Sequence, residues 1–240
     1  MANSRKLKSP YMTVKLLNSL KGFYTLKELE KILGINSHIL WRYTALINIP
    51  EKKTSNKIIG KTLENNLIEK IVNKVISINS RGYVETWRYL YDVHFLGIVG
   101  YEVARFVNLN QIDTVFVFPE EDAPLALAVS EWLKCKVCVG FSEAKLSLRN
   151  YLSSSYISLD RGKIVHIYVP RGIIEEGDEV ILVKNIAKNW DSLRAVVDLL
   201  NYLKASIYGI FVVVSLSNEW KEKAIKYGIT NIKVLKEMIN

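Results

Sequence analysis

The stretch Gly177-Asp-Glu-Val-Ile-Leu-Val-Lys-Asn-Ile-Ala-Lys-Asn-Trp-Asp-Ser-Leu193 decides the fold of this chain. Its apolar run predicts a buried strand over 179–183, because a strand covered on both faces reads as a continuous hydrophobic segment. A polar loop follows, and the spacing of the next apolar residues predicts a helix over 192–203. A buried strand that leads into a helix is the repeating unit of a parallel α/β sheet.

The same alternation continues on both sides of this stretch. Further strands are predicted at 114–118, 136–141, 163–169, 206–215 and 232–235, and an aromatic-rich strand at 83–90. Further helices are predicted at 97–107, 123–133 and 218–227. Strands that alternate with helices predict a mostly parallel sheet, and such sheets bind ligands at the carboxyl ends of their strands.

The excess positive charge lies entirely in the N-terminal third of the chain. The formal net charge is +9; residues 1–79 contain 14 Lys/Arg and 5 Asp/Glu, whereas residues 80–240 contain 19 of each. A small basic module joined to a neutral body predicts a polyanionic partner for the module and a separate task for the body. Hydrophobic residues make up 49% of the chain, enough for a packed core, which excludes a disordered protein.

Two further observations exclude classes of protein. Apolar runs stay below the ~18–20 residues that span a bilayer, and the basic residues 1–10 have no apolar segment behind them. We therefore expect a cytoplasmic, nucleoid-associated protein with no membrane partner and a flexible basic N-terminal arm. Cys135 and Cys138 form a CxxC in a strand-like run with no histidine near in sequence, so we interpret them as ordinary strand residues and expect no metal.

Residues 25–47 carry the clearest local pattern. Thr25 and Glu28 have capping-box spacing at the start of one helix, and Gly34 suits its end before a second helix begins. Two short helices joined by a turn that contains glycine are typical of a helix-turn-helix motif. Glu30 departs from that motif, which usually has a small residue there. The alternative is a plain helical appendage with a solvated lysine face.

The second helix of such a motif enters the major groove of DNA with its outward residues. Arg42 is the natural donor, because its planar guanidinium matches guanine or phosphate. Residues 51–57 predict a loop or short wing that touches phosphates, and a third helix is expected from Thr62 to about Ile78. The candidate DNA-binding residues are Ser37, His38, Trp41, Arg42, Lys52 and Lys53.

The neutral body resembles the type I phosphoribosyltransferases of the orotate kind. Residues 118–133 (FPEEDAPLALAVSEWL) and 136–145 (KVCVGFSEAK) are similar to that family's phosphate-gripping loop, helix and following strand, and residues 177–193 to its diphosphate-sugar segment. The resemblance covers roughly residues 80–240 and implies a parallel-sheet phosphoribosyltransferase-like domain. A helix-turn-helix ahead of such a domain also resembles a group of archaeal transcriptional regulators, which implies DNA binding and a homodimer.

The chain departs from that family's pattern where the family binds phosphoribosyl pyrophosphate. Lys184 and Asn185 replace two carboxylates, and Trp190 stands in place of a glycine, where we expect its bulk to crowd the phosphate. Three carboxylates stand in the pyrophosphate loop, where they repel an anion. The residues of this degenerate ligand cleft are Glu120, Glu121, Asp122, Lys184, Asn185, Lys188, Asn189, Trp190, Asp191 and Ser192.

Alternatives remain open for these residues. The acidic loop 120–122 is either a solvated loop or a partner for Lys184 across the cleft. The Ser-rich residues 147–162 occupy the place of the family's mobile hood or form an exposed hairpin.

The sequence thus predicts a helix-turn-helix domain over 1–60, a linker helix over 61–79 and a phosphoribosyltransferase-like domain over 80–240. We expect a homodimeric DNA-binding transcriptional regulator that binds double-stranded DNA and responds to a nucleotide-related effector, with no catalytic residues and no cofactor. Two alternatives are an active orotate or nucleobase phosphoribosyltransferase with a basic accessory domain, and a structural chromatin protein without sequence preference.

Overall fold

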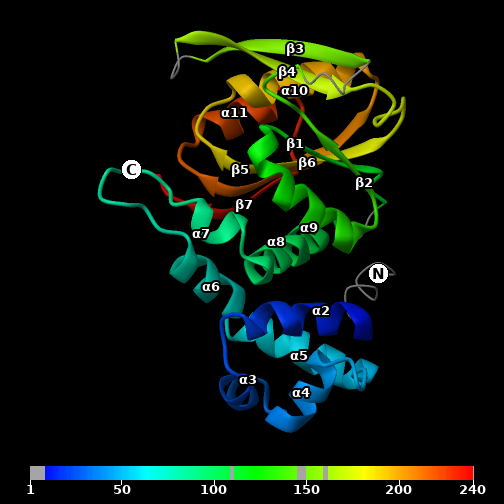
Figure 1. Ribbon diagram of the computed structural model, residues 1–240, viewed down its shortest axis with the longest axis vertical. Coiled ribbons are helices and arrows are strands. Elements are labelled where there is room, and N and C mark those ends of the chain that lie inside the picture. The colour runs from blue at the N-terminus through cyan, green and yellow to red at the C-terminus, as the bar shows by residue number, and fades with distance from the viewer. Residues whose placement is uncertain (1–8, 109–110, 145–149, 159–161, 240) are drawn as a thin grey trace. The chain divides into compact units, whose positions relative to one another are not determined.

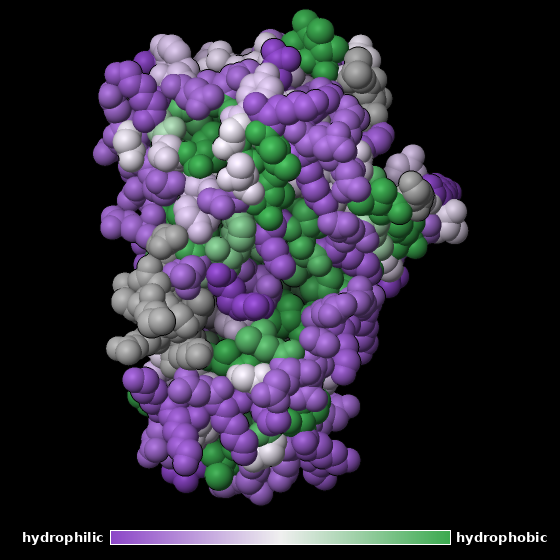
Figure 2. Space-filling view, turned by 180° about the vertical axis from the view of Figure 1, so that it is seen from behind, coloured by the Kyte–Doolittle hydropathy of each residue, from purple (hydrophilic) through white to green (hydrophobic). Residues whose placement is uncertain are grey.

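A computed structural model describes residues 9–108, 111–144, 150–158 and 162–239 (Figure 1). The chain divides into two compact units, Met1–Asn110 and Gln111–Asn240, which are described separately here. Hydrophilic side chains cover most of the face seen in Figure 2, with apolar patches between them. Within the described residues, the helices are all too short or too polar to cross a membrane.

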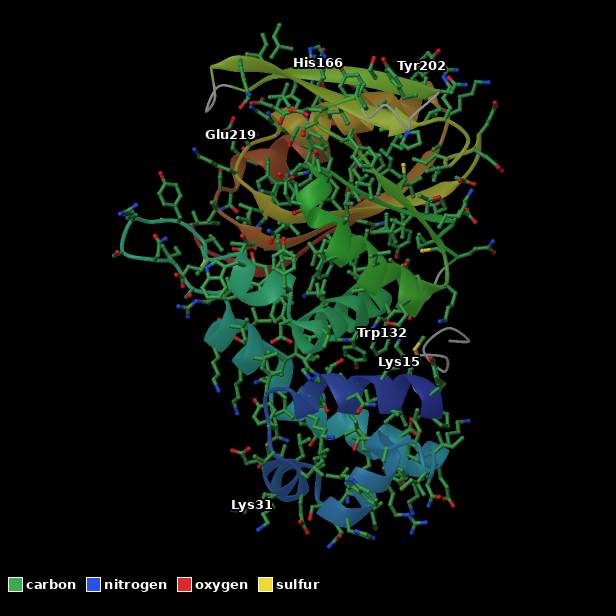
Figure 3. The ribbon with its side chains drawn as sticks, in the orientation of Figure 1. Lys15, Lys31, Trp132, His166, Tyr202 and Glu219 are labelled. Atoms are coloured by element: carbon green, nitrogen blue, oxygen red, sulfur yellow. The ribbon has the colours of Figure 1, made fainter. Side chains whose placement is uncertain are left out.

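The first unit is helical. Its helices are α2 (Pro10–Lys21), α3 (Leu26–Leu33), α4 (Ser37–Thr44), α5 (Lys52–Glu64), α6 (Leu67–Val75), α7 (Trp87–Leu90) and α8 (Val93–Phe106). Helices α2 to α5 pack on one another around buried leucines, and α8 packs on α2. The excess charge of residues 1–79 lies within this unit, because residues 80–110 add equal numbers of basic and acidic residues. Lys31 of α3 is one of its exposed lysines (Figure 3).

Local sequence signals position α3 and α4 as predicted. The Thr25 amide donates to Glu28 Oε2 at 2.7 Å and the Glu28 amide to Thr25 Oγ1 at 3.2 Å, so the capping box is complete. Gly34 ends α3 in the left-handed region, with φ 62°. Asn36 then caps α4 by accepting from the His38 amide at 2.9 Å. The two helices and the turn between them are therefore confirmed.

Two predictions for this unit were wrong, and a third falls mostly outside the described residues. Residues 52–57 are not a loop or wing but the first turns of α5, with Glu51 at its N-cap position. The expected single helix from Thr62 to Ile78 is divided, because Asn66 adopts a left-handed conformation (φ 51°) between α5 and α6. The flexible N-terminal arm was predicted over residues 1–10. Residues 1–8 lie outside the described residues, whereas Ser9 caps the unpredicted helix α2, which begins at Pro10.

The aromatic-rich stretch 83–90 is not a strand. Val84 forms one isolated antiparallel bridge with Ile78, and Trp87–Leu90 is the short helix α7. Only Tyr89 and Leu90 of α7 are buried, whereas Tyr83 and Trp87 are exposed. The aromatic residues of this stretch have high β-propensity, which led to the strand prediction. The packing of Tyr89 and Leu90 against the helical core favours a helix instead.

The second unit is a parallel α/β sheet (Figure 1). Strands β1 (Thr114–Val117), β2 (Lys136–Val139), β5 (Glu179–Ala187), β6 (Ser206–Ser215) and β7 (Ile232–Glu237) run in the order β2-β1-β5-β6-β7, all parallel. Helices α9 (Ala123–Leu133), α10 (Asp191–Tyr202) and α11 (Glu219–Lys226) connect successive parallel strands, and the short 3₁₀ helix η1 (Glu120–Asp122) precedes α9. This confirms the predicted fold class.

The Ser-rich segment contributes an exposed hairpin, which was one of its two predicted forms. Strands β3 (Tyr151–Ser158) and β4 (Lys163–Pro170) pair antiparallel in one uninterrupted register. Phe141, just after β2, bridges Tyr168 of β4, and α10 packs against β3. Leu152 and Tyr156 of β3 pack on the core of the sheet.

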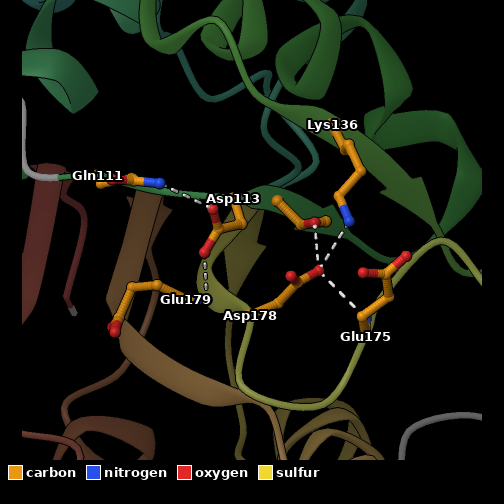
Figure 4. Close-up of polar contacts among 7 residues, drawn as sticks. Gln111, Asp113, Lys136, Glu175, Asp178 and Glu179 are labelled. Atoms are coloured by element: carbon orange, nitrogen blue, oxygen red, sulfur yellow. Dashed lines mark hydrogen bonds and ion pairs between the residues drawn. The ribbon is translucent and has the colours of Figure 1, made fainter.

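Polar contacts join the amino ends of three strands (Figure 4). Asp178 Oδ2, just before β5, accepts from Lys136 Nζ of β2 at 2.9 Å and from Thr114 Oγ1 of β1 at 3.4 Å. Asp113 Oδ2 accepts from the Glu179 amide at 2.9 Å. These contacts fix the strand ends opposite to the candidate ligand cleft.

The CxxC cysteines are strand residues, as predicted. Cys138 lies buried in β2 and Cys135 is half-buried just before it; both thiols are free. Burial raises the pKa of the Cys138 thiol to about 12 and that of Cys135 to about 11, so neither is poised as a thiolate ligand. Within the described residues there is no His/Cys/Asp/Glu cluster that could hold a metal ion.

Close packing of α2 on α8 gives a test of the helical unit. A Cβ atom at Gly22, which follows α2, would overlap Cβ and Cγ of His94 in α8. Gly22→Ala is therefore expected to lower the free energy of unfolding by about 1–3 kcal/mol. Gly60→Ala is the matched control, because a Cβ inside α5 meets nothing nearer than Glu64 Oε1 at 4.0 Å.

Urea denaturation of the two variants measures this difference. Gly60→Ala should raise stability by up to about 1 kcal/mol, since alanine restricts the unfolded chain more than glycine does. Equal stability of Gly22→Ala and the unchanged chain would contradict the α2–α8 packing.

Candidate functional site

The candidate cleft lies at the carboxyl ends of β1 and β5, which are neighbours in the sheet. The chain leaves β1 through Phe118 and Pro119 into the acidic 3₁₀ helix η1, and it leaves β5 into the loop before α10. The topology therefore brings the segments 118–122 and 184–192 to one edge, as parallel α/β sheets do with their ligand loops. The two groups of predicted cleft residues come together in this way.

Asp122 binds the end of β5 rather than facing solvent. Its side chain is buried, and its Oδ2 accepts a hydrogen bond from the Asn185 amide at 3.0 Å. Burial raises the pKa of Asp122 to about 6, although the charge of Lys184 and the Asn185 amide both favour the ionised form. The neighbouring Glu121 opposes ionisation further. Of the two alternatives for this loop, a purely solvated loop is therefore excluded for Asp122.

Lys184 also turns toward this loop. Its ammonium donates a hydrogen bond to the Phe118 carbonyl oxygen at 3.0 Å, and its charge stabilises ionised Asp122. The predicted pairing of Lys184 with the acidic loop is thus present as an electrostatic attraction combined with a backbone hydrogen bond. Lys184 is half-buried, so solvent screens this attraction only in part.

Glu120 anchors the other end of η1. Its two carboxylate oxygens accept from the Ser142 amide at 2.9 Å and from Ser142 Oγ at 2.8 Å. Glu121 is exposed and is the one carboxylate of the three that faces solvent. Sequence spacing gave no signal for Ser142, because it lies 22 residues away and meets Glu120 only through the pairing of β1 with β2.

A small cavity lies between these strand ends and the start of α10. Its volume is about 10 Å³, and β1, β5 and α10 residues that include Phe118, Lys184 and Ser192 line it. That volume suits about one water molecule.

Trp190 has a different environment from the one predicted. It does not stand in an open loop: the indole is only 3% exposed, belongs to the core of the sheet and packs against Tyr227, with ring centroids 5.3 Å apart. Its Nε1 and Asp191 Oδ2 are buried without a hydrogen-bond partner among the described residues. Lys188 is exposed, Asn189 is half-buried and Ser192 is buried. Trp190 is therefore a core residue. The expectation that its ring crowds a phosphate in the loop is corrected, because the ring packs inside the sheet unit.

The candidate DNA-binding residues lie along one part of the helical unit. His38 and Trp41 of α4 stack with centroids 5.7 Å apart, and both are exposed. Arg42 is half-buried, and its Nη2 lies 3.1 Å from the Asn48 amide oxygen in the amide orientation that satisfies both groups. Lys52 and Lys53 are exposed on the first turn of α5, and Ser37 is half-buried.

Sequence reasoning missed two features near these residues. Lys57 of α5 donates to the Gly34 carbonyl at 2.7 Å and so fixes the turn between α3 and α4. Helix α4 and the segment after it expose large apolar side chains, which the helix-turn-helix pattern did not predict. These exposed residues are Ile39 in α4 and Leu46, Ile47 and Ile49 after it.

Comparisons with known proteins agree on the fold of the second unit. No family model matches the chain. Among solved structures, adenine phosphoribosyltransferase from Rhodothermus marinus matches with a TM-score of 0.62 and 14% identity, over 72% of this chain and 99% of that enzyme. The enzyme from Giardia lamblia, complexed with 9-deazaadenine, matches with a TM-score of 0.62 and 16% identity, over 71% of this chain and 97% of that one. The chain has a type I phosphoribosyltransferase fold.

One curated relative is a regulator. The purine biosynthesis transcriptional repressor PurR of Bacillus subtilis is 24% identical over 133 residues, which are 55% of this chain and 47% of that repressor. This chain is thus similar in sequence to a transcriptional repressor and in fold to the phosphoribosyltransferases.

Asp122 gives a prediction for the dependence of stability on pH. Its pKa is higher in the folded chain (about 6) than the ordinary value of 3.8, so between these values the unfolded chain loses the proton first. Stability should therefore fall by about 2–3 kcal/mol as pH rises from ~4 to ~6 and stay level above, as far as this group is concerned. Asp122→Asn should remove that fall.

Urea unfolding at a series of pH values checks this prediction. Glu121→Gln is the control, because Glu121 is the exposed neighbour on the same turn and should leave most of the fall in place. A pH profile of Asp122→Asn that matches the unchanged chain would contradict the burial of this carboxylate.

Proposed function

We propose that this chain is a DNA-binding transcriptional regulator. Its helical unit binds duplex DNA through a helix-turn-helix formed by α3 and α4. Its phosphoribosyltransferase-fold unit dimerises, responds to a nucleotide-related effector and catalyses no transfer. The regulator acts in the cytoplasm. Similarity to the PurR repressor supports this reading, although the match spans about half of that protein.

The position of two lysines carries the DNA-binding part of the proposal. Lys52 and Lys53 occupy the first turn of α5, which has no acidic residue there and no side-chain cap. Because the amino end of a helix carries partial positive charge, each lysine there costs about 0.3–1 kcal/mol. A bound phosphate offsets this cost, since free backbone N–H groups and ammonium groups then converge on one anion.

Helix α4 supports the same conclusion. His38 and Trp41 project from it as a stacked pair, and the partly exposed tryptophan loses part of the benefit of burial. Arg42 lies one residue further along and shares its guanidinium with Asn48. A helix that presents aromatic, imidazole and guanidinium groups suits the major groove, where such groups reach base edges and phosphates.

The boundary of the phosphoribosyltransferase-like domain lies before Gln111 in this proposal. The second compact unit, Gln111–Asn240, is 130 of 240 residues, whereas the solved enzymes align with 70–72% of the chain. The aligned part must therefore include residues ahead of 111. This supports a phosphoribosyltransferase-like domain that includes residues 80–110, and we propose 1–60 as the DNA-binding domain and 61–79 as the connection.

An active phosphoribosyltransferase is the second candidate function, because the structural match extends over 99% of an adenine phosphoribosyltransferase chain. The residues at the end of β5 oppose it. Lys184 and Asn185 offer an ammonium and an amide where that fold needs acidic partners for ribose hydroxyls. Asp122 and Glu120 are bound to Asn185 and Ser142 of the chain itself.

The proposal predicts how salt affects binding of a mixed-sequence DNA duplex. Each phosphate contact contributes about 0.9 to the slope of log K against log salt, so Lys52→Ala/Lys53→Ala should reduce that slope by about 2. Fluorescence anisotropy of the full chain, between roughly 50 and 200 mM salt, measures the slope. Lys163→Ala/Lys226→Ala, which removes two exposed lysines of the second unit, is the matched control and should change nothing. An unchanged slope in the first variant, or no DNA binding at low salt, rejects the proposal.

A further inference from the structure

Strand β3 has an open edge. Among the described residues, β3 pairs with β4 alone, in a continuous register from Tyr151 opposite Pro170 to Ser158 opposite Lys163. The backbone N–H and C=O groups on its other side face away from β4. An edge strand of this kind is a template for another strand.

The edges of the five-stranded sheet are protected against pairing, whereas the edge of β3 is not. At the edges of the five-stranded sheet, β2 is four residues long and β7 carries Lys233, Lys236 and Glu237. Strand β3 reads Tyr-Leu-Ser-Ser-Ser-Tyr-Ile-Ser over 151–158, with no charge, proline, glycine or bulge. Those are the usual devices that stop edge strands from pairing, and β3 lacks all of them.

The space beside this edge is open. Two cavities of about 410 and 380 Å³ follow one another between β3 and α10. Ser155–Ile157 and the first turns of α10 line the first, and Tyr151–Ser154 and the last turns line the second, with Asp198 shared. The groove thus runs along the whole strand, with the edge of β3 as one wall and α10 as the other.

The sequence of β3 is complementary to itself. If two copies pair antiparallel about Ser154, Tyr151 meets Ile157 of the other copy, Leu152 meets Tyr156, and Ser153 meets Ser155. Aromatic residues then face aliphatic ones and serine faces serine, which are favourable cross-strand pairs. The inward side chains of one copy, Leu152 and Tyr156, also stay on the inner face in the other copy.

We propose that the open edge of β3 pairs with β3 of a second copy of this chain, which joins the two hairpins into a four-stranded antiparallel sheet. The two-fold axis passes through Ser154. This interface rests on the dimer that the proposed function invokes, and it gives that dimer a location.

Exposed apolar surface around the groove supports a second copy as the occupant. Tyr151, Ile157, Ile164 and Tyr202 are 40%, 65%, 61% and 75% exposed. They lie along the hairpin and the end of α10. Figure 2 shows apolar surface near the turn of the hairpin, and Figure 3 labels Tyr202 toward its other end, where Tyr202 lines a cavity with Tyr151. At about 150–250 Å² for a large side chain, they present on the order of 400 Å², roughly half of what each partner buries in a standard interface. Backbone pairing and the wall of α10 supply the rest.

A charge-pattern experiment tests this interface. Ser153 and Ser155 are both exposed, so lysines there leave the fold of one copy intact. In Ser153→Lys/Ser155→Lys, lysine meets lysine twice across the two-fold axis, which should weaken the dimer about tenfold or more. In the matched variant Ser153→Lys/Ser155→Glu, lysine meets glutamate twice, and the dimer should form as in the unchanged chain.

Sedimentation of the full chain, without DNA, measures the dimer dissociation constant of all three proteins, and circular dichroism confirms that each is folded. A dimer in the unchanged chain that the lysine pair weakens and the lysine–glutamate pair restores supports the proposal. Three outcomes overturn it: a lysine-pair variant that dimerises normally, a lysine–glutamate variant as weak as the lysine pair, or an unchanged chain that is monomeric into the high micromolar range. A monomeric chain would indicate instead that a strand of another protein pairs with the edge of β3. None of these outcomes bears on the salt dependence of DNA binding, so the two proposals fail separately.

Discussion

The attachment of the acidic loop to the end of β5 is the constraint on which the second unit depends. Asp122 accepts from the Asn185 amide, and Lys184 donates to the Phe118 carbonyl, so the loop after β1 and the end of β5 hold each other. Burial of the ionised Asp122 carboxylate costs free energy, which raises its pKa. The charge of Lys184 and the hydrogen bond from the Asn185 amide offset part of this cost. The loop after β1 and the end of β5 are thus each other's partners.

In the proposed regulator, this attachment lets the chain keep the fold of an enzyme while the loops after β1 and β5 hold each other. The parallel sheet with its crossover helices supplies a stable core, a hairpin and an outer surface, and none of these needs an open ligand loop. Charge is divided between the two units, since the helical unit carries the whole excess of positive charge and the sheet unit is neutral. A fold of this kind constrains architecture, while the residues at its loops determine what it does.

The sequence predicted most of this architecture, and its errors have physical reasons. Apolar runs identified the five parallel strands, most clearly β1, β5 and β6, whose residues are mostly buried. The Thr25 capping box with Gly34 identified α3 and the turn to α4. Residues 51–57 were misread because polar composition suggested a loop, whereas Ser55 and Ile58 pack inward on one face of α5. Trp190 was placed in the loop by analogy with a glycine, but its ring turns into the core beside Tyr227, a contact between residues far apart in sequence. The bond between Glu120 and Ser142 likewise depends on strand pairing that spacing alone does not reveal.

Calorimetric titration of the full chain with phosphoribosyl pyrophosphate and Mg²⁺ tests the central claim most directly. An adenine phosphoribosyltransferase, measured under the same conditions, provides the positive control. The account predicts no saturable heat for this chain, because Lys184 and Asn185 offer no carboxylates to ribose hydroxyls or metal and the acidic loop repels the diphosphate. A dissociation constant in the low micromolar range, or release of pyrophosphate when a nucleobase is added, would contradict it and identify the chain as a working transferase.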